Sequence, residues 1–90
     1  MIKVINARRT ANMNPPFLYS SWLEYWEKKT GNHAGYCACC GCTKRAEHGA
    51  HVRKYESFDD TVYIVPLCAE CNNPNNVTPF YVDCTLCKAV

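Results

Sequence analysis

Eight cysteines, spaced as four Cys-x-x-Cys pairs, constrain this 90-residue chain more than any other feature of its sequence. The pairs are Cys37/Cys40, Cys39/Cys42, Cys68/Cys71 and Cys84/Cys87. This spacing lets two thiolates bind one Zn²⁺ at about 2.3 Å, and two such pairs complete a tetrahedral site. A chain this short buries only a small core, so a metal ion effectively offsets the conformational entropy that opposes folding. The cysteines therefore predict at least one zinc site.

The first two pairs interleave, so the ligand set of the first site has to be chosen. Gly41 follows Cys40, where a knuckle favours glycine, whereas Cys42 lies nearer the next strand. We expect the first site to consist of Cys39, Cys42, Cys68 and Cys71. The other four thiols, Cys37, Cys40, Cys84 and Cys87, could form a second site. The alternative is that the two sets of sulfurs lie close enough to mix. One Zn²⁺ is predicted and two are allowed, and an iron centre would use the same ligands.

The clearest secondary-structure signal is a helix over residues 21–30. Ser21 and Glu24 fit a capping box, and Gly31 suits the left-handed conformation just after a helix. Trp22, Tyr25 and Trp26 lie close together on this helix. We expect them to pack in the core rather than to form a platform for stacking bases.

The remaining segments predict short strands. Residues 3–6 read as a strand, and residues 48–55 and 61–65 as a hairpin around the turn at Asp59-Asp60. Residues 68–73 read as one helical turn and residues 80–87 as a last strand. The chain is expected to be a single zinc-binding domain over 1–90. It comprises a lead-in (1–20), the helix (21–30) and a cysteine-rich core (37–90).

Charge and hydropathy exclude some classes of protein. The sequence contains no apolar run long enough to span a membrane and no signal peptide, so we expect a cytoplasmic chain with reduced cysteines. The net charge of +2 is too small to indicate nucleic-acid binding by itself. If nucleic acid is bound, phosphate contacts are expected from the basic residues of the lead-in (Lys3, Arg8 and Arg9), from Lys44 and Arg45 directly after the knuckle, and from Arg53 and Lys54 at the end of the first strand of the hairpin.

Residues 37–73 resemble the zinc-bearing branch of HNH-type nucleases and other treble-clef proteins. The most specific part of the resemblance is the run Pro66-Leu67-Cys68-x-x-Cys71-Asn72. The resemblance implies a small α+β zinc-stabilised domain that is treble-clef-like: a zinc knuckle, a β-hairpin and a short helical turn. The aromatic helix would pack at one side of this unit.

The same resemblance places His51 at the position of the general base that activates water in HNH nucleases. The preceding residue, which can bind the catalytic metal in that family, is Ala50 here, and Asn72 stands where active relatives often have His. We therefore expect His51 to be a neutral structural histidine beside the zinc site. The alternatives are a zinc ligand that replaces one cysteine and a residual catalytic base.

These observations favour a non-catalytic zinc-binding module that contacts nucleic acid or protein, with a monomer as the default state. A degenerate HNH-type metal-dependent endonuclease is one alternative. A thiol redox or metal-handling protein is another.

Overall fold

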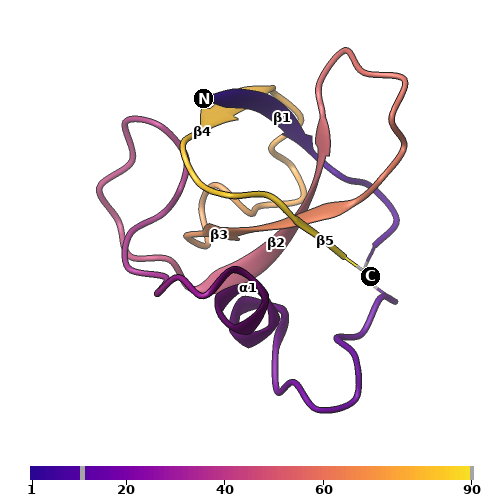
Figure 1. The fold of residues 1–90 in the computed structure, drawn as a ribbon. Helices are drawn as coiled ribbons and strands as arrows, with labels where there is room; N and C mark the ends of the chain where they lie inside the picture. Colours follow the sequence, from indigo (N-terminus) through magenta and orange to yellow (C-terminus); the bar gives the residue numbers. More distant parts are fainter. Residues whose placement is uncertain (11, 90) are drawn as a thin grey trace.

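One helix and five strands make up the fold in the computed structural model, which describes residues 1–10 and 12–89 (Figure 1). The elements are β1 (Ile2–Asn6), α1 (Trp22–Thr30), β2 (His48–Lys54), β3 (Tyr63–Leu67), β4 (Phe80–Val82) and β5 (Cys87–Lys88). The strands form one antiparallel sheet in the order β4-β1-β2-β3-β5. The small α+β class predicted from the sequence is confirmed. No helix in the described residues is long and apolar enough to cross a membrane.

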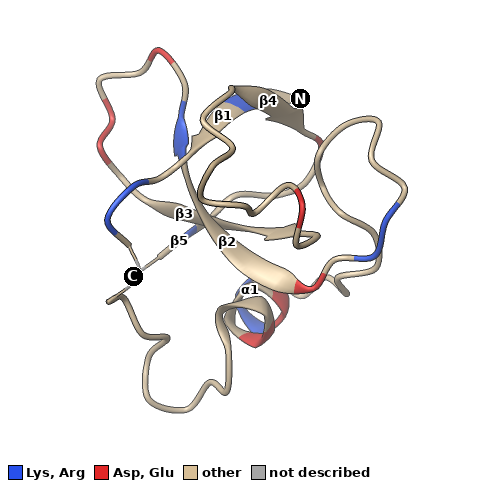
Figure 2. Ribbon diagram, turned by 180° about the vertical axis from the view of Figure 1, so that it is seen from behind, with Lys and Arg blue, Asp and Glu red and all other residues tan. Residues whose placement is uncertain are grey.

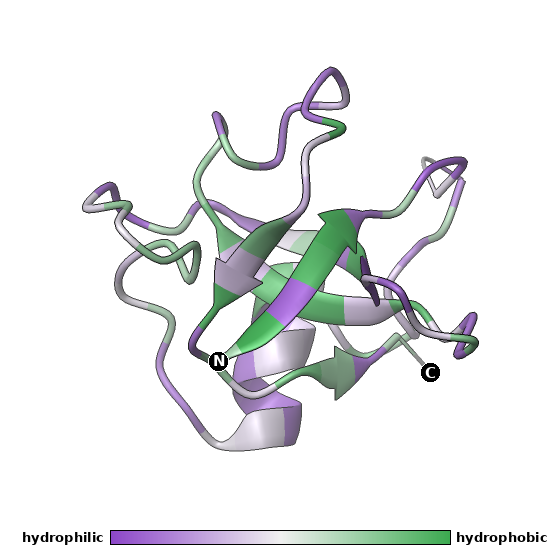
Figure 3. Cartoon of the chain, turned by 90° about the horizontal axis from the view of Figure 1, so that it is seen from above, coloured by the Kyte–Doolittle hydropathy of each residue, from purple (hydrophilic) through white to green (hydrophobic). Residues whose placement is uncertain are grey.

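The two faces of the sheet bury two separate cores. Because side chains alternate along a strand, Val4, Val52 and Val65 share one face. They pack with Cys37 and Cys68 in the first core, and Figure 3 shows hydrophobic stretches along the strands of the sheet. Ile64 faces the other way and packs under helix α1, which supplies most of the second core. Figure 1 shows α1 lying against the part of the sheet formed by β2, β3 and β5.

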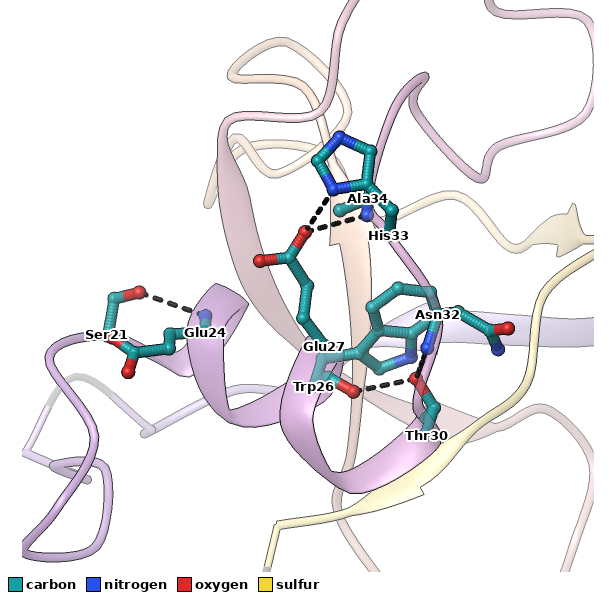
Figure 4. Close-up of polar contacts among 8 residues, drawn as sticks. All are labelled: Ser21, Glu24, Trp26, Glu27, Thr30, Asn32, His33 and Ala34. Carbon is teal, nitrogen blue, oxygen red and sulfur yellow. Dashed lines mark hydrogen bonds and ion pairs between the residues drawn. The ribbon is translucent and has the colours of Figure 1, made fainter.

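Helix α1 begins and ends where its sequence predicts. The Ser21 hydroxyl accepts a 3.0 Å hydrogen bond from the Glu24 N–H (Figure 4). Gly31 closes the helix in the left-handed conformation, at φ 74°. In a capping box the glutamate also accepts a hydrogen bond from the backbone N–H of the first capping residue. Here the Glu24 carboxylate accepts from Ser20 instead of Ser21. Glu27 accepts from the Ala34 N–H at 2.8 Å and so fixes the chain that leaves the helix.

The aromatic residues of α1 are core residues, as expected. Trp22, Tyr25 and Trp26 are buried, and each polar ring atom donates a hydrogen bond to a backbone carbonyl. The acceptors are Met13 for Trp22 (3.1 Å), Lys88 for Tyr25 (2.7 Å) and Thr85 for Trp26 (2.8 Å). The helix thereby ties the lead-in and the C-terminal segment to the sheet.

The predicted hairpin is present as β2 and β3. Its loop is held by Asp59, whose carboxylate accepts from Thr61 N–H (2.9 Å) and from Tyr63 O–H (2.8 Å). These hydrogen bonds lower the pKa of Asp59 to about 2. The predicted last strand over 80–87 is two short strands instead. β4 pairs with β1 and β5 pairs with β3, so the chain between them crosses from one sheet edge to the other.

The helix and the sheet meet most closely at Gly49. A Cβ atom placed there would lie 2.3 Å from the backbone carbon of Trp22 and 2.5 Å from the backbone nitrogen of Leu23. Both contacts are with backbone, which cannot rotate away as a side-chain end can. Glycine is therefore required at this position of β2 for α1 to pack on the sheet.

We predict that Gly49→Ala lowers the free energy of unfolding by about 1–3 kcal/mol, because the added methyl group forces helix and sheet apart. Gly35→Ala is the matched control, since a Cβ at Gly35 meets no atom within 4 Å. Urea unfolding followed by tryptophan fluorescence measures both variants. Equal stability of the two variants would contradict this account of the contact.

Candidate metal centre

Four thiols converge at one end of the first core. The sulfur atoms of Cys37, Cys42, Cys68 and Cys71 all lie within 4.8 Å of one another. The Sγ atoms of Cys42 and Cys68 are 3.8 Å apart. A tetrahedral zinc ion with Zn–S bonds of about 2.3 Å separates its sulfur ligands by about 3.8 Å. The group therefore fits a bound metal ion.

Two loops carry these four cysteines. The first is closed by the Cys37 N–H, which donates to the Lys44 carbonyl at 2.8 Å, and by a bridge between Tyr36 and Arg45. Gly41 has a positive φ of 86°, which lets the tip of this loop turn tightly. This closure brings Cys42 back beside Cys37 across the loop.

The second loop leaves β3 directly, because Cys68 is the first residue after Leu67. A single turn follows, in which the Asn72 N–H donates to the Cys68 carbonyl at 3.0 Å. The two loops are joined through the sheet, since the Ala38 N–H donates to the Pro66 carbonyl at 2.8 Å. Strand β3 therefore sets the distance between both pairs of thiols.

The surroundings of the thiols affect their protonation. Burial raises the pKa of Cys37 to about 11, although the backbone groups of Cys68 and Cys39 hydrogen-bond to it and oppose the rise. Burial also raises the pKa of Cys71, and the neighbouring thiols Cys68 and Cys37 add to the effect. At Cys68 burial acts in the same direction, but hydrogen bonds from Cys71, Cys42 and Cys37 outweigh it and lower the pKa. Thiols packed this closely need a cation before they can all become thiolates.

The group differs at one position from the set expected from the spacing. Cys42, Cys68 and Cys71 are together, but the fourth sulfur is that of Cys37 and not that of Cys39. The reason is the loop closure at Cys37 and Lys44, which pairs residues across a longer loop than a Cys-x-x-Cys turn does. Cys39 lies beside the group and forms a β-bridge with Val82.

The four thiols proposed for a second site are not brought together. Among the described residues one group of metal-ligand type is present, and it contains Cys37. Cys40 is exposed, with its sulfur 3.1 Å from that of Met1. Cys84 lies between the two cores, where burial raises its pKa to about 11, and Cys87 packs against the helix side of the sheet.

Asn6 supports the centre and was not found by sequence reasoning. Its side-chain amide, at the end of β1, donates to the carbonyls of Cys71 (3.0 Å) and Asn76 (3.2 Å). The Asn76 amide also donates to the Cys71 carbonyl at 3.2 Å. These bonds fix the loop after Cys71 to the sheet. No sequence signal links Asn6 to a cysteine 65 residues away.

His51 lies away from the thiols, on the helix face of the sheet. Its ring meets the edge of Trp22 at a centroid distance of 5.0 Å. The Nε2 atom has less than 1 Å² of accessible surface and no hydrogen-bond partner. Burial lowers the pKa of His51, which favours the neutral ring. The structure thus places His51 beside the helix and outside the group that fits a metal.

Two pairs of the basic residues expected to contact phosphate, Lys44-Arg45 and Arg53-Lys54, do not share one surface. Figure 2 shows Lys44-Arg45 and Arg53-Lys54 on opposite sides of the molecule, separated by the length of β2. Lys44 pairs with the Glu70 carboxylate, and the Lys54 ammonium lies 5.1 Å from the centre of the Tyr63 ring. Arg53 is on the opposite face of β2 from Lys54, because neighbouring residues of a strand alternate.

Comparisons with protein-family models, with curated proteins and with solved structures find no match.

We predict that acid destabilises the protein partly through His51. Its native pKa lies below the unfolded value of 6.5, so the unfolded state binds more protons as the pH falls through that value. The wild type should therefore lose stability relative to His51→Gln between pH 7.5 and 6.0, by at most about 1.4 kcal/mol per pH unit. Urea unfolding of both proteins at saturating zinc measures this difference. Parallel losses in the two proteins would contradict the burial of a neutral ring.

Proposed function

We propose that this chain is a non-catalytic zinc-binding module that contacts nucleic acid or a protein partner. The observation that carries the proposal is the group formed by Cys37, Cys42, Cys68 and Cys71, with its 3.8 Å sulfur–sulfur distance. Four thiolates are a ligand set that suits zinc, and they leave no open position for a substrate. Such closed sites are typical of zinc that stabilises a fold.

The position of His51 supports the absence of catalysis. A general base must come within hydrogen-bond reach of the proton that it removes. The Nε2 atom of His51 is shielded from solvent beside Trp22. Among the described residues, no further group of His, Cys, Asp and Glu side chains of metal-binding geometry lies near it.

The treble-clef arrangement and the choice of partner are part of the same proposal. The loop of residues 37–44, the β2–β3 hairpin and the turn after Cys68 follow one another as knuckle, hairpin and turn do in treble-clef proteins. The resemblance of residues 37–73 to that class supports a role in contacting nucleic acid or protein.

The first test is elemental analysis of the purified protein, followed by chelation at neutral pH. We expect one zinc ion per chain and loss of the folded amide spectrum when zinc is removed, because zinc contributes on the order of 10 kcal/mol to folding at such sites. Cys37→Ser should lose the ion. Cys40→Ser, which changes an exposed thiol outside the group, should keep it.

Bound iron would contradict zinc as the metal. An unchanged amide spectrum after complete chelation would contradict a metal-stabilised fold. If Cys37→Ser retained zinc and Cys39→Ser lost it, the fourth ligand would be Cys39, as expected from the Cys-x-x-Cys spacing, and not Cys37.

The second test addresses catalysis. Incubation of the zinc-loaded protein with plasmid DNA and Mg²⁺, Mn²⁺ or Ni²⁺ is expected to leave the plasmid intact. Cleavage that disappears in His51→Ala would instead establish a degenerate HNH-type endonuclease.

A further inference from the structure

Helix α1 covers only part of its side of the sheet. It packs on β2, β3 and β5, and no comparable element packs over β1 and β4 in the described residues. Figure 1 shows β1 and β4 at the end of the sheet away from the helix. The side chains that point to this side from β4, β1 and the end of β2 are therefore available to a partner. We call them the tyrosine–lysine face; they are Lys3, Ile5, Arg53, Tyr55 and Tyr81.

The centre of this face is a row of three side chains across three chain segments. Lys3 of β1 is paired in register with Tyr81 of β4. On its other side the Lys3 carbonyl accepts from the Tyr55 N–H at 3.0 Å, just after β2. The Lys3 ammonium lies 4.9 Å from the centre of the Tyr55 ring and 5.8 Å from that of Tyr81. One cation is thus held between two aromatic rings.

Further basic residues lie beside this row, along β1 and just beyond its end. Arg53 is the register partner of Ile5 on the same face, and Arg8 and Arg9 are exposed immediately beyond the end of β1. None of the five side chains of the face is acidic. The nearest acidic residues in the sequence are Glu56, which follows Tyr55, and Asp83, which lies two residues after Tyr81. Figure 2 shows basic segments on β1, at the end of β2 and in the loop after β1. The row of rings is therefore bordered by cations on one side.

We propose that the tyrosine–lysine face binds single-stranded nucleic acid, with bases stacking on Tyr81 and Tyr55 and phosphates contacting Lys3 and Arg53. This inference rests on the proposed function and names the partner of that module. Tyr81 is exposed and Tyr55 is half-buried. Accessible aromatic rings interleaved with cations are the chemistry that binds unpaired bases and their backbone together.

The same features argue against two other occupants. A duplex keeps its bases stacked on one another, so it offers phosphates to the cations but no free base to the rings. An acidic peptide would use the cations and gain nothing specific from a flat exposed ring such as Tyr81, which is 48% exposed. Of these three occupants, an unpaired strand is the one that uses both kinds of side chain in the row.

The experiment is a fluorescence-anisotropy titration of the zinc-loaded protein with labelled 12-nucleotide single strands, DNA and RNA, and with the corresponding duplexes. We expect tighter binding of single strands than of duplexes. Tyr81→Ala should weaken binding about 5- to 150-fold, which is the effect of losing one stacked base. Tyr81→Phe, which keeps the ring, should bind like the wild type.

Two further variants separate this face from the rest of the surface. Lys3→Gln should reduce the slope of log affinity against log salt by about 0.7, the value for one phosphate contact with a single strand. Tyr36→Ala is the matched control, because Tyr36 is 69% exposed but lies outside the face, at the base of the loop that carries Cys37 and Cys42. It should bind like the wild type. Bound zinc, measured for every variant, shows that each one is folded.

Absence of binding at low salt, equal binding of duplexes, or equal losses in Tyr81→Ala and Tyr36→Ala would each overturn the proposal. Capture of acidic peptide in preference to oligonucleotide would do the same. These failures leave one zinc per chain unaffected, so they are distinct from failure of the zinc-binding function, which the elemental analysis reports.

Discussion

Four thiols converge above one face of the sheet, and the packing of the two loops that cover this face depends on how these thiols interact. The loops over residues 37–46 and 68–79 contain no regular helix or strand, yet they cover one face of the sheet. Buried thiols this close together repel one another once ionised, and each loses hydration when it is buried. A cation removes both costs at once. The packing of the layer over Val4, Val52 and Val65 would therefore depend on a metal ion held by these thiols, as the proposed zinc-binding function requires.

The sheet separates the layer that contains the four thiols from a second layer that is held by ordinary packing. On the other face, Trp22, Tyr25 and Trp26 bury a large aromatic area, and their polar atoms are all bonded to backbone carbonyls. Gly49 sets how closely that helix approaches. His51 is on this second side, which is why it neither joins the thiols nor reaches solvent with Nε2. The two layers meet at Cys84, which contacts both cores.

Local features of the sequence predicted local structure well. Ser21 and Gly31 mark the ends of α1 because capping depends only on residues within one turn. The turn at Asp59 similarly locates the hairpin. The pairing of β1 with both β2 and β4 had no signal, because β-pairing brings together residues that are far apart in the sequence.

The choice of cysteine ligands likewise depends on contacts that exist only in the folded chain. The Cys-x-x-Cys spacing correctly indicated that thiols would gather, but Cys37 and Cys39 are equivalent to any rule of spacing. What distinguishes them is a hydrogen bond between Cys37 and Lys44 that only the folded loop contains. The role of Asn6 was invisible for a related reason: its amide reaches the loop after Cys71 through space rather than along the chain.

The edges of the sheet have a consequence for the behaviour of the chain in solution. An open strand edge presents unpaired backbone groups that can join another molecule, and short or covered edges prevent this. Here one edge is β5, only two residues long. The other edge is β4, and the loop of residues 37–44 covers it, since the Cys40 N–H donates to the Tyr81 carbonyl at 2.9 Å. If the four thiols hold zinc as proposed, removal of the ion would free that loop and uncover β4, and the metal would then also keep one molecule from adding to the sheet of the next.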